Sequence, residues 1–142
     1  MSSSPQRAQR NTEERGVNSV TAAIIGAAMK VHSALGPGLL EKAYSACLAY
    51  ELRKQGFDVK TEVELPVIYE SVRIDLGYRI DFLVNDLVIV ELKCVEKIIP
   101  VHEAQIISYL RLCRKSVGLL INFHVRHLKD GIKRFVEGTD WN

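Results

Sequence analysis

The chain has 142 residues, of which 47% are hydrophobic and 25% are charged. These values are typical of one soluble globular domain with a buried core, and they exclude a disordered or fibrous chain. The net charge of +2 is too small to identify a nucleic-acid binder by itself. No apolar run reaches the roughly 20 residues that span a bilayer, and the N-terminus lacks the apolar core of a signal peptide. The three cysteines, Cys47, Cys94 and Cys113, lack the spacing of a zinc site. We therefore expect a cytoplasmic protein with reduced thiols and no membrane association.

The N-terminal part is predicted to contain a tail and two helices. Residues 1–16 are polar and rich in Ser, Gln and Arg, which predicts a disordered tail before a single domain over 17–142. Apolar residues recur at helical spacing over 17–35, and a second apolar stripe runs over 39–55. The Gly-Pro-Gly segment at 36–38 ends the first helix, because glycine accepts the left-handed conformation and proline cannot continue a helix.

The rest of the chain has the spacing of β-strands, interrupted by one helix. Residues 58–70, DVKTEVELPVIYE, look like a strand, and the proline within them indicates an edge position or a bulge. Two apolar runs over 79–93 predict a hairpin. A helix is expected over 101–114, then a buried strand over 117–123 and a last strand over 131–136. The order ααβββαβ(β) predicts an α/β (α+β) fold with a mixed sheet flanked by helices.

The predicted hairpin carries three charges, Asp81, Glu91 and Lys93, in otherwise apolar strands. Because successive strand residues face opposite sides of a sheet, Glu91 and Lys93 share one face. A two-residue turn at Asn85-Asp86 would place Asp81 and Glu91 on opposite faces, whereas a three-residue loop or a bulge would place them opposite each other. Two carboxylates at that distance repel unless one is protonated or a cation bridges them. The hairpin is thus either an ordinary strand pair with a salt-bridge lysine or a site for a hard divalent cation.

Two further stretches place polar side chains on helices. In VHEAQIISYL, Gln105 and Tyr109 are four residues apart and lie on one helical face. In GPGLLEKAY, Glu41 and Tyr44 are three residues apart at the start of the second helix, after Gly38. Structural explanations are available for both stretches, because Gln105 fits an exposed surface and a glutamate in a first helical turn is stabilised by the helix dipole.

The region from residue 111 to residue 134 is basic, with seven bases and one acid, Asp130. Such clustering could contact phosphates, and a solvated basic face explains it equally well. The residues expected to bind nucleic acid are Arg111, Arg114, Lys115, Lys129, Lys133 and Arg134.

Together these stretches resemble known families. The signature of the GxxExxY protein family is matched by Gly38, Glu41 and Tyr44. The core of the RecB-like branch of the PD-(D/E)XK nuclease superfamily is matched, in chain order, by Asp81, Glu91-x-Lys93 and Gln105-x-x-x-Tyr109. The resemblance covers about residues 17–136, and it departs from the pattern at Ile80, where the motif has proline.

The resemblance implies a restriction-endonuclease-like fold, with a central mixed sheet of about four to five strands flanked by helices. It also implies roles for the matching residues. The ligands of Mg²⁺ or Mn²⁺ would be Asp81, Glu91, the Leu92 backbone carbonyl and Glu41. Lys93 would activate water and stabilise charge on the phosphate. Gln105 and Tyr109 would order the site or contact the phosphate backbone.

The resemblance indicates a metal-dependent phosphodiesterase that acts on nucleic acid, with DNA expected over RNA. Every charged position of the pattern is filled, which favours an active nuclease. One alternative is a catalytically silent nucleic-acid-binding or protein-interaction module that keeps the fold. Another is a nuclease that works as a homodimer or with a partner protein. The fold does not choose among these functions.

Overall fold

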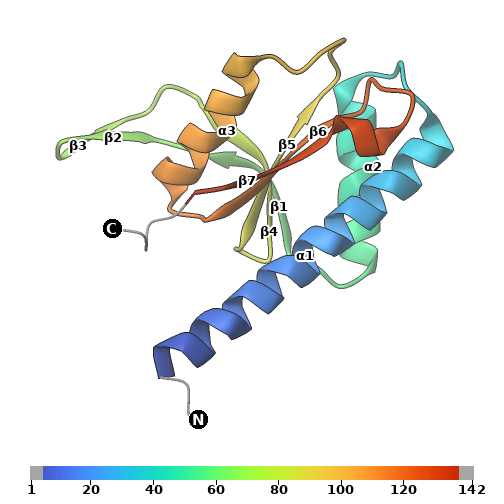
Figure 1. Ribbon diagram of the computed structural model, residues 1–142. Coiled ribbons are helices and arrows are strands. Elements are labelled where there is room, and N and C mark those ends of the chain that lie inside the picture. Colours follow the sequence, from blue (N-terminus) through green and yellow to red (C-terminus); the bar gives the residue numbers. More distant parts are fainter. Residues whose placement is uncertain (1–4, 138–142) are drawn as a thin grey trace.

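The computed structural model of the protein describes residues 5–137, and of residues 5–15 it describes the backbone alone (Figure 1). The helices are α1 (Pro5–Leu35), α2 (Glu41–Lys54), α3 (Pro100–Cys113) and a 3₁₀ helix η1 (Leu128–Gly131). The strands are β1 (Val59–Glu64), β2 (Val67–Tyr69), β3 (Val72–Ile74), β4 (Arg79–Val84), β5 (Val88–Lys93), β6 (Val117–Asn122) and β7 (Ile132–Val136).

Five of these strands form one mixed sheet in the order β1-β4-β5-β6-β7. The β5–β6 pair is parallel, and the other neighbours are antiparallel. Helix α3 connects the two parallel strands, as a parallel pair requires a long crossover. The predicted mixed sheet flanked by helices is therefore confirmed, including the last strand expected over 131–136, and it has the form of a restriction-endonuclease-like core.

Helices cover both faces of the sheet (Figure 1). On one face, α1 and α2 pack against strand side chains that include Phe82, Val90 and Leu92. On the other face, the buried Ile106 and Leu110 of α3 belong to a second core. This division shows that Val90 and Leu92 face away from α3. Glu91 and Lys93 alternate with them along β5 and therefore face toward α3.

Helix α1 begins well before the predicted start at residue 17, which corrects the expectation of a disordered tail over 1–16 for the part that the structure describes. The packed turns over 17–35 provide a helix nucleus, and the preceding Gln, Arg, Ala and Glu residues are good helix formers. Figure 1 shows these first turns extending past the sheet. Among the described residues, no helix combines the length and the apolar character that crossing a bilayer requires.

The strand-like segment over 58–70 is divided in two. Residues before Pro66 form β1 at the edge of the main sheet, and residues after it form β2, which pairs with β3 in a separate two-stranded sheet. The edge position agrees with the prediction from Pro66, whereas the separate hairpin was not predicted. Side chains of this hairpin, including Tyr69 and Val72, are exposed.

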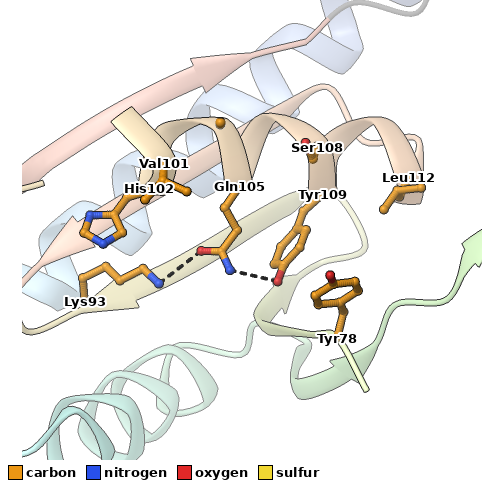
Figure 2. A pocket seen from close by; sticks show the side chains of 9 residues that line it. Tyr78, Lys93, Val101, His102, Gln105, Ser108, Tyr109 and Leu112 are labelled. Atoms are coloured by element: carbon orange, nitrogen blue, oxygen red, sulfur yellow. Dashed lines mark hydrogen bonds between the residues drawn. The ribbon is translucent and has the colours of Figure 1, made fainter. Parts of the chain in front are cut away.

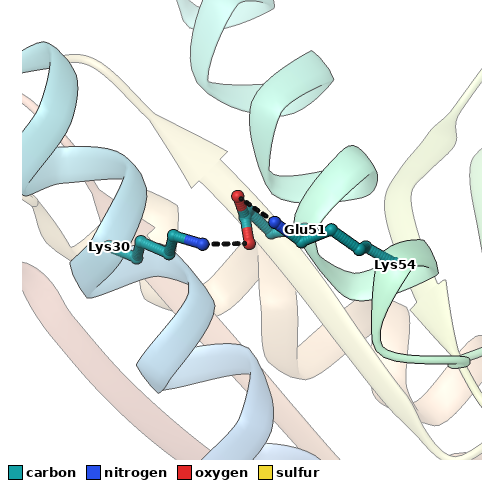
Figure 3. Close-up of polar contacts among 3 residues, drawn as sticks. All are labelled: Lys30, Glu51 and Lys54. Carbon is teal, nitrogen blue, oxygen red and sulfur yellow. Dashed lines mark hydrogen bonds and ion pairs between the residues drawn. The ribbon is translucent and has the colours of Figure 1, made fainter.

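An ion-pair cluster joins the two helices that cover the first face (Figure 3). Lys30 Nζ of α1 lies 3.0 Å from Glu51 Oε2 of α2, and Lys54 Nζ lies 3.3 Å from Glu51 Oε1. The hydrogen bond from Lys30 lowers the pKa of Glu51. Glu51 thus has both carboxylate oxygens matched by cations from the chain itself.

Candidate active site

The register of the β4–β5 hairpin sets Asp81 across from Glu91. The paired residues are Phe82 with Val90, Leu83 with Ile89 and Val84 with Val88, so the loop is Asn85–Leu87. Extending the same register by one step brings the two carboxylates opposite each other. The three-residue loop is therefore the correct alternative, and the two-residue turn is wrong. Asn85 and Asp86 both have positive φ angles, of 51° and 55°, which these residue types tolerate.

At this end the strands are joined by side chains. The Asp81 backbone N–H donates to Glu91 Oε1 at 3.2 Å, and the Leu92 N–H donates to Asp81 Oδ2 at 2.8 Å. Each carboxylate therefore reaches across to the neighbouring strand. These two bonds use one oxygen of each acid, Glu91 Oε1 and Asp81 Oδ2. Besides burial and the charge of Asp81, a side-chain hydrogen bond with Asp81 contributes to the raised pKa of Glu91.

The surroundings of Glu91 disfavour its negative charge. Only 4% of the residue is exposed, and burial together with the Asp81 carboxylate raises the pKa of Glu91 to about 9, although Lys93 opposes this rise. Two adjacent acids of this kind hold a proton between them at neutral pH or take up a cation. The pair is therefore poised to bind positive charge.

Lys93 lies on the same face of the sheet and contacts α3 (Figure 2). Its Nζ donates to Gln105 Oε1 at 3.1 Å, and Gln105 Nε2 donates to the Tyr109 hydroxyl at 3.0 Å. Only 6% of Tyr109 is exposed, so this buried residue is a fixed end for the series of hydrogen bonds. Burial raises the pKa of the Tyr109 hydroxyl. The two helical residues, one turn apart, thus hold the lysine in place, and Gln105 is not a surface residue without a contact.

Glu41 approaches the same group from the start of α2. Burial raises the pKa of Glu41, the nearby Asp81 carboxylate raises it further, and Lys93 opposes the rise. Glu41 itself is exposed at the first residue of the helix. The structure brings it toward the two acids, and its role as a metal ligand stays a prediction.

The other two residues of the GxxExxY pattern shape the loop before Glu41. Gly38 has a φ of 102°, a conformation that favours glycine. Tyr44 is fully buried, its hydroxyl accepts from the Leu39 N–H at 3.1 Å and donates to the Gly36 carbonyl at 2.5 Å, and its ring stacks on Phe123. These contacts fix the loop, so Gly38 and Tyr44 position Glu41, and membership of the GxxExxY family stays a prediction.

The metal ligands expected from the sequence are only partly assembled. Within residues 5–137, no group of three or more His, Cys, Asp or Glu side chains is arranged to hold a metal ion. What the fold does assemble is the facing pair of Asp81 and Glu91, with the Leu92 backbone beside Asp81. Glu41 stays a predicted further ligand, and backbone, water or substrate oxygens would complete the set.

The basic residues expected to bind nucleic acid are spread over the molecule. Lys115 Nζ lies 3.1 Å from Asp86 Oδ1, at the hairpin loop, which is the end of the strands away from Asp81. On β7, Lys133 and Arg134 point to opposite sides, because Lys133 pairs with Glu103 of α3 while Arg134 bonds Asn18 of α1.

The remaining three bases add no common surface. Arg111 lies 3.0 Å from Glu137 Oε1, and Arg114 ends α3. Lys129 is in η1, between β6 and β7. The six residues therefore form no single basic patch beside the two acids, and their nucleic-acid-binding role stays a prediction.

Two residues near the site were not singled out by the sequence. Asn122 pairs with Lys93 in the parallel ladder, is buried, and holds the Val95 backbone through Nδ2 and Oδ1 at 2.8 and 3.1 Å. It anchors the chain just after the lysine. The indication in the sequence was a single asparagine at the end of an apolar strand. Tyr78, just before β4, packs near Tyr109 with 6.2 Å between ring centroids.

A family model described as the PD-(D/E)XK nuclease superfamily matches residues 18–135. Comparison with curated proteins and with solved structures finds no match. The matched range runs from α1 to β7 and so includes every element that positions the facing acids, the lysine and the Gln105–Tyr109 pair.

Proposed function

Because the chain belongs to the PD-(D/E)XK nuclease superfamily, we propose that it is a divalent-metal-dependent phosphodiesterase that cleaves nucleic acid. The observation that carries this proposal is the facing pair of Asp81 and Glu91 with Lys93 on the same side of the sheet. Hydrolysis of a phosphodiester needs a water-derived nucleophile near neutral pH and neutralisation of developing negative charge. The three side chains have the chemistry for both tasks.

The donor set fits Mg²⁺ or Mn²⁺. These hard cations prefer oxygen ligands, and Mg²⁺ is commonly held by one or two carboxylates while waters and substrate oxygens complete its shell. The carboxylates of Asp81 and Glu91 supply oxygens of this kind, and a bound cation would offset the burial and the Asp81 charge that raise the pKa of Glu91. When bound, the ion would act as a Lewis acid and lower the pKa of a coordinated water. We assign Asp81 and Glu91 as its ligands, with Glu41 and the Leu92 carbonyl as further candidates.

Lys93 has a separate role in this proposal. Its ammonium donates to the Gln105 amide and has further protons with which to contact a phosphate oxygen. Gln105 and Tyr109 hold the lysine, so they are positioning residues. The proposed substrate is nucleic acid, with DNA expected over RNA.

A cleavage assay tests the proposal. Labelled single- and double-stranded DNA and RNA are incubated with Mg²⁺ or Mn²⁺ and wild-type protein, Asp81→Asn or Lys93→Ala. Both variants are expected to lose cleavage. Matched controls are Asp86→Asn, at the far end of the same hairpin, and Lys54→Ala, on α2. Undiminished cleavage by both site variants would contradict the mechanism, and a wild type that binds but never cleaves would favour the silent binding module.

A further inference from the structure

A cavity of about 510 Å³ lies directly beside the proposed catalytic lysine, between α3 and the residues that enter β4 (Figure 2). Its volume lies within the usual range of small-molecule sites. Lys93 and Gln105 line one end of it. Figure 2 shows Tyr78 and Leu112 at the other end. The cavity is therefore continuous with the site described above and extends well beyond it.

The two ends of this cavity differ in chemistry. The lysine end carries a positive charge held by an amide. The other end presents Tyr78, a residue that is 44% exposed, with the exposed Leu112 near it, whereas the exposed Val101 lies nearer the lysine end (Figure 2). Tyr109 lies next to Tyr78, with 6.2 Å between the ring centroids and the two ring planes inclined at 54°. The exposed Tyr78 thus lies beside a buried aromatic residue and can offer a ring surface to a ligand.

A nucleotide has the same division into an anionic phosphate and a flat apolar base. We propose that this cavity takes one unpaired nucleobase, stacked on Tyr78, while the adjoining phosphodiester lies at Lys93. This inference rests on the proposed function and specifies its substrate class. Stacking on an aromatic side chain tolerates any base, since every base has a π-face. The cavity thus selects for an available base and not for a sequence.

The base has to be unpaired for a physical reason. A base in a duplex is stacked on its neighbours, so entry into the cavity requires it to leave the stack, and this cost is smallest for a strand that is already single. The bases of the 111–134 region are divided between the two sides of the sheet, since Lys133 pairs with Glu103 of α3 and Arg134 with Asn18 of α1. Both features favour single-stranded substrate or a single-stranded end. Stacking alone does not distinguish DNA from RNA, so both sources are compared.

The test measures binding separately from cleavage. Fluorescence anisotropy in Ca²⁺ gives the Kd of the full chain for four probes, and a gel confirms that each stays intact. The probes are a thymidine octamer, a uridine octamer, an abasic octamer with the same phosphates and a stable blunt-ended DNA duplex. The proteins are wild type, Tyr78→Ala, Tyr78→Trp and, as a matched control, Tyr69→Ala on the β2–β3 hairpin. Circular dichroism checks that each variant is folded.

We expect the wild type to bind the thymidine octamer about 10-fold more tightly than the abasic octamer, which corresponds to one stacked base. Tyr78→Ala should remove this difference, whereas Tyr78→Trp and Tyr69→Ala should keep it. Weaker binding of Tyr78→Ala than of wild type to only one of the thymidine and uridine octamers also supports the cavity and indicates which nucleic acid it accepts. The inference is overturned if Tyr78→Ala keeps the wild-type ratio of Kd values for the abasic and thymidine octamers. It is also overturned if Tyr78→Ala weakens binding to the duplex as much as binding to the single strand.

The outcome is independent of the proposed function. If no metal supports cleavage but the base effect depends on Tyr78, the nuclease proposal fails and the base site stands. If the protein cleaves nucleic acid and Tyr78→Ala keeps the wild-type ratio of Kd values, the nuclease proposal stands and only the base-site inference fails.

Discussion

Glu51 and Glu91 have the same side chain, and each is held by elements of the fold, yet their surroundings are opposite. Glu51 lies between Lys30 and Lys54, and the hydrogen bond from Lys30 lowers its pKa. Glu91 lies against Asp81 inside the protein, and burial and that second acid raise its pKa. Lys30 and Lys54 neutralise the charge of Glu51, whereas the surroundings of Glu91 favour binding of a proton or a cation. Glu51 therefore joins two helices, whereas the surroundings of Glu91 agree with its proposed role as a cation ligand.

The largest expected effect of breaking this contrast is on catalysis. Glu91→Gln keeps the shape of the side chain and removes the charge that the proposal assigns to metal binding. Loss of several kcal/mol of transition-state stabilisation corresponds to about 100-fold or more in rate. We expect kcat/KM for a single-stranded substrate to fall by at least this factor. The same substitution at Glu51 should leave kcat/KM within about 3-fold of wild type, since the ion pairs of Glu51 with Lys30 and Lys54 lie outside the proposed site. Equal losses in the two variants would remove the basis of the contrast.

The second effect concerns cation binding to the folded state. A ligand that binds only the folded protein stabilises it by about 2.7 kcal/mol at 100 times its Kd. For a domain of this size we expect Mg²⁺ or Mn²⁺ to raise Tm by about 5 °C or more. Differential scanning fluorimetry with and without EDTA measures this shift. It should vanish in Glu91→Gln and persist in Glu51→Gln; a shift of the same size in all three proteins would assign the cation to another site.

The third effect is the pH dependence of stability in EDTA. The pKa of Glu91 in the folded protein, about 9, lies above its ordinary value of 4.5, so the folded state holds the proton more strongly than the unfolded state. This contribution is fully present below about pH 4.5 and is lost as the pH rises toward 9. Wild-type Tm should therefore fall between about pH 5 and pH 9, and Glu91→Gln should fall less. Parallel Tm curves for the two proteins over this range would show that Glu91 ionises normally.

The smallest effect is expected from Glu51→Gln itself. The lowered pKa of Glu51 means that its contribution is present above the ordinary pKa of 4.5 and is lost as the pH falls through its folded value. Because its lysine partners are solvated, we expect a Tm loss of about 1–2 °C at pH 7. The loss should shrink below pH 4 and in high salt. A Tm loss that ignores both acid and salt would indicate a packing effect and not an ion pair.

Much of the fold followed from periodicity. The helical spacing over 17–35 and the alternation in the hairpin predicted elements that the structure contains, because burial of one face requires those repeats. The placement of Glu91 and Lys93 on one face was also accessible, since it needs only alternation. The same alternation places Lys133 and Arg134 on opposite faces of the last strand. The sequence therefore allowed their separation to be predicted, although a count of charges did not.

Other features depended on contacts between distant segments. The dihedral angles of Asn85 and Asp86 decide the hairpin register, and several loop lengths suit the same residues. The role of Asn122 depends on its parallel pairing with Lys93, which the sequence does not specify. Tyr78 lies outside any predicted strand pattern, and only the position of α3 makes it a wall of the cavity. The separate β2–β3 sheet likewise required knowing where the chain turns after Pro66.

The sequence by itself determined that this chain has a mixed sheet with helices on it and carries two acids and a lysine in adjoining strands, because side-chain periodicity and residue chemistry are local properties. The tertiary structure alone decided that Asp81 faces Glu91, that Gln105 and Tyr109 hold Lys93, and that a ring-walled cavity opens beside them. These are distances between segments far apart in the chain, and they are set by strand register and by helix packing. The difference between Glu91 and Glu51 arises in the same way: the two side chains are chemically identical, and only their folded neighbours make one an ion pair and the other a candidate cation ligand.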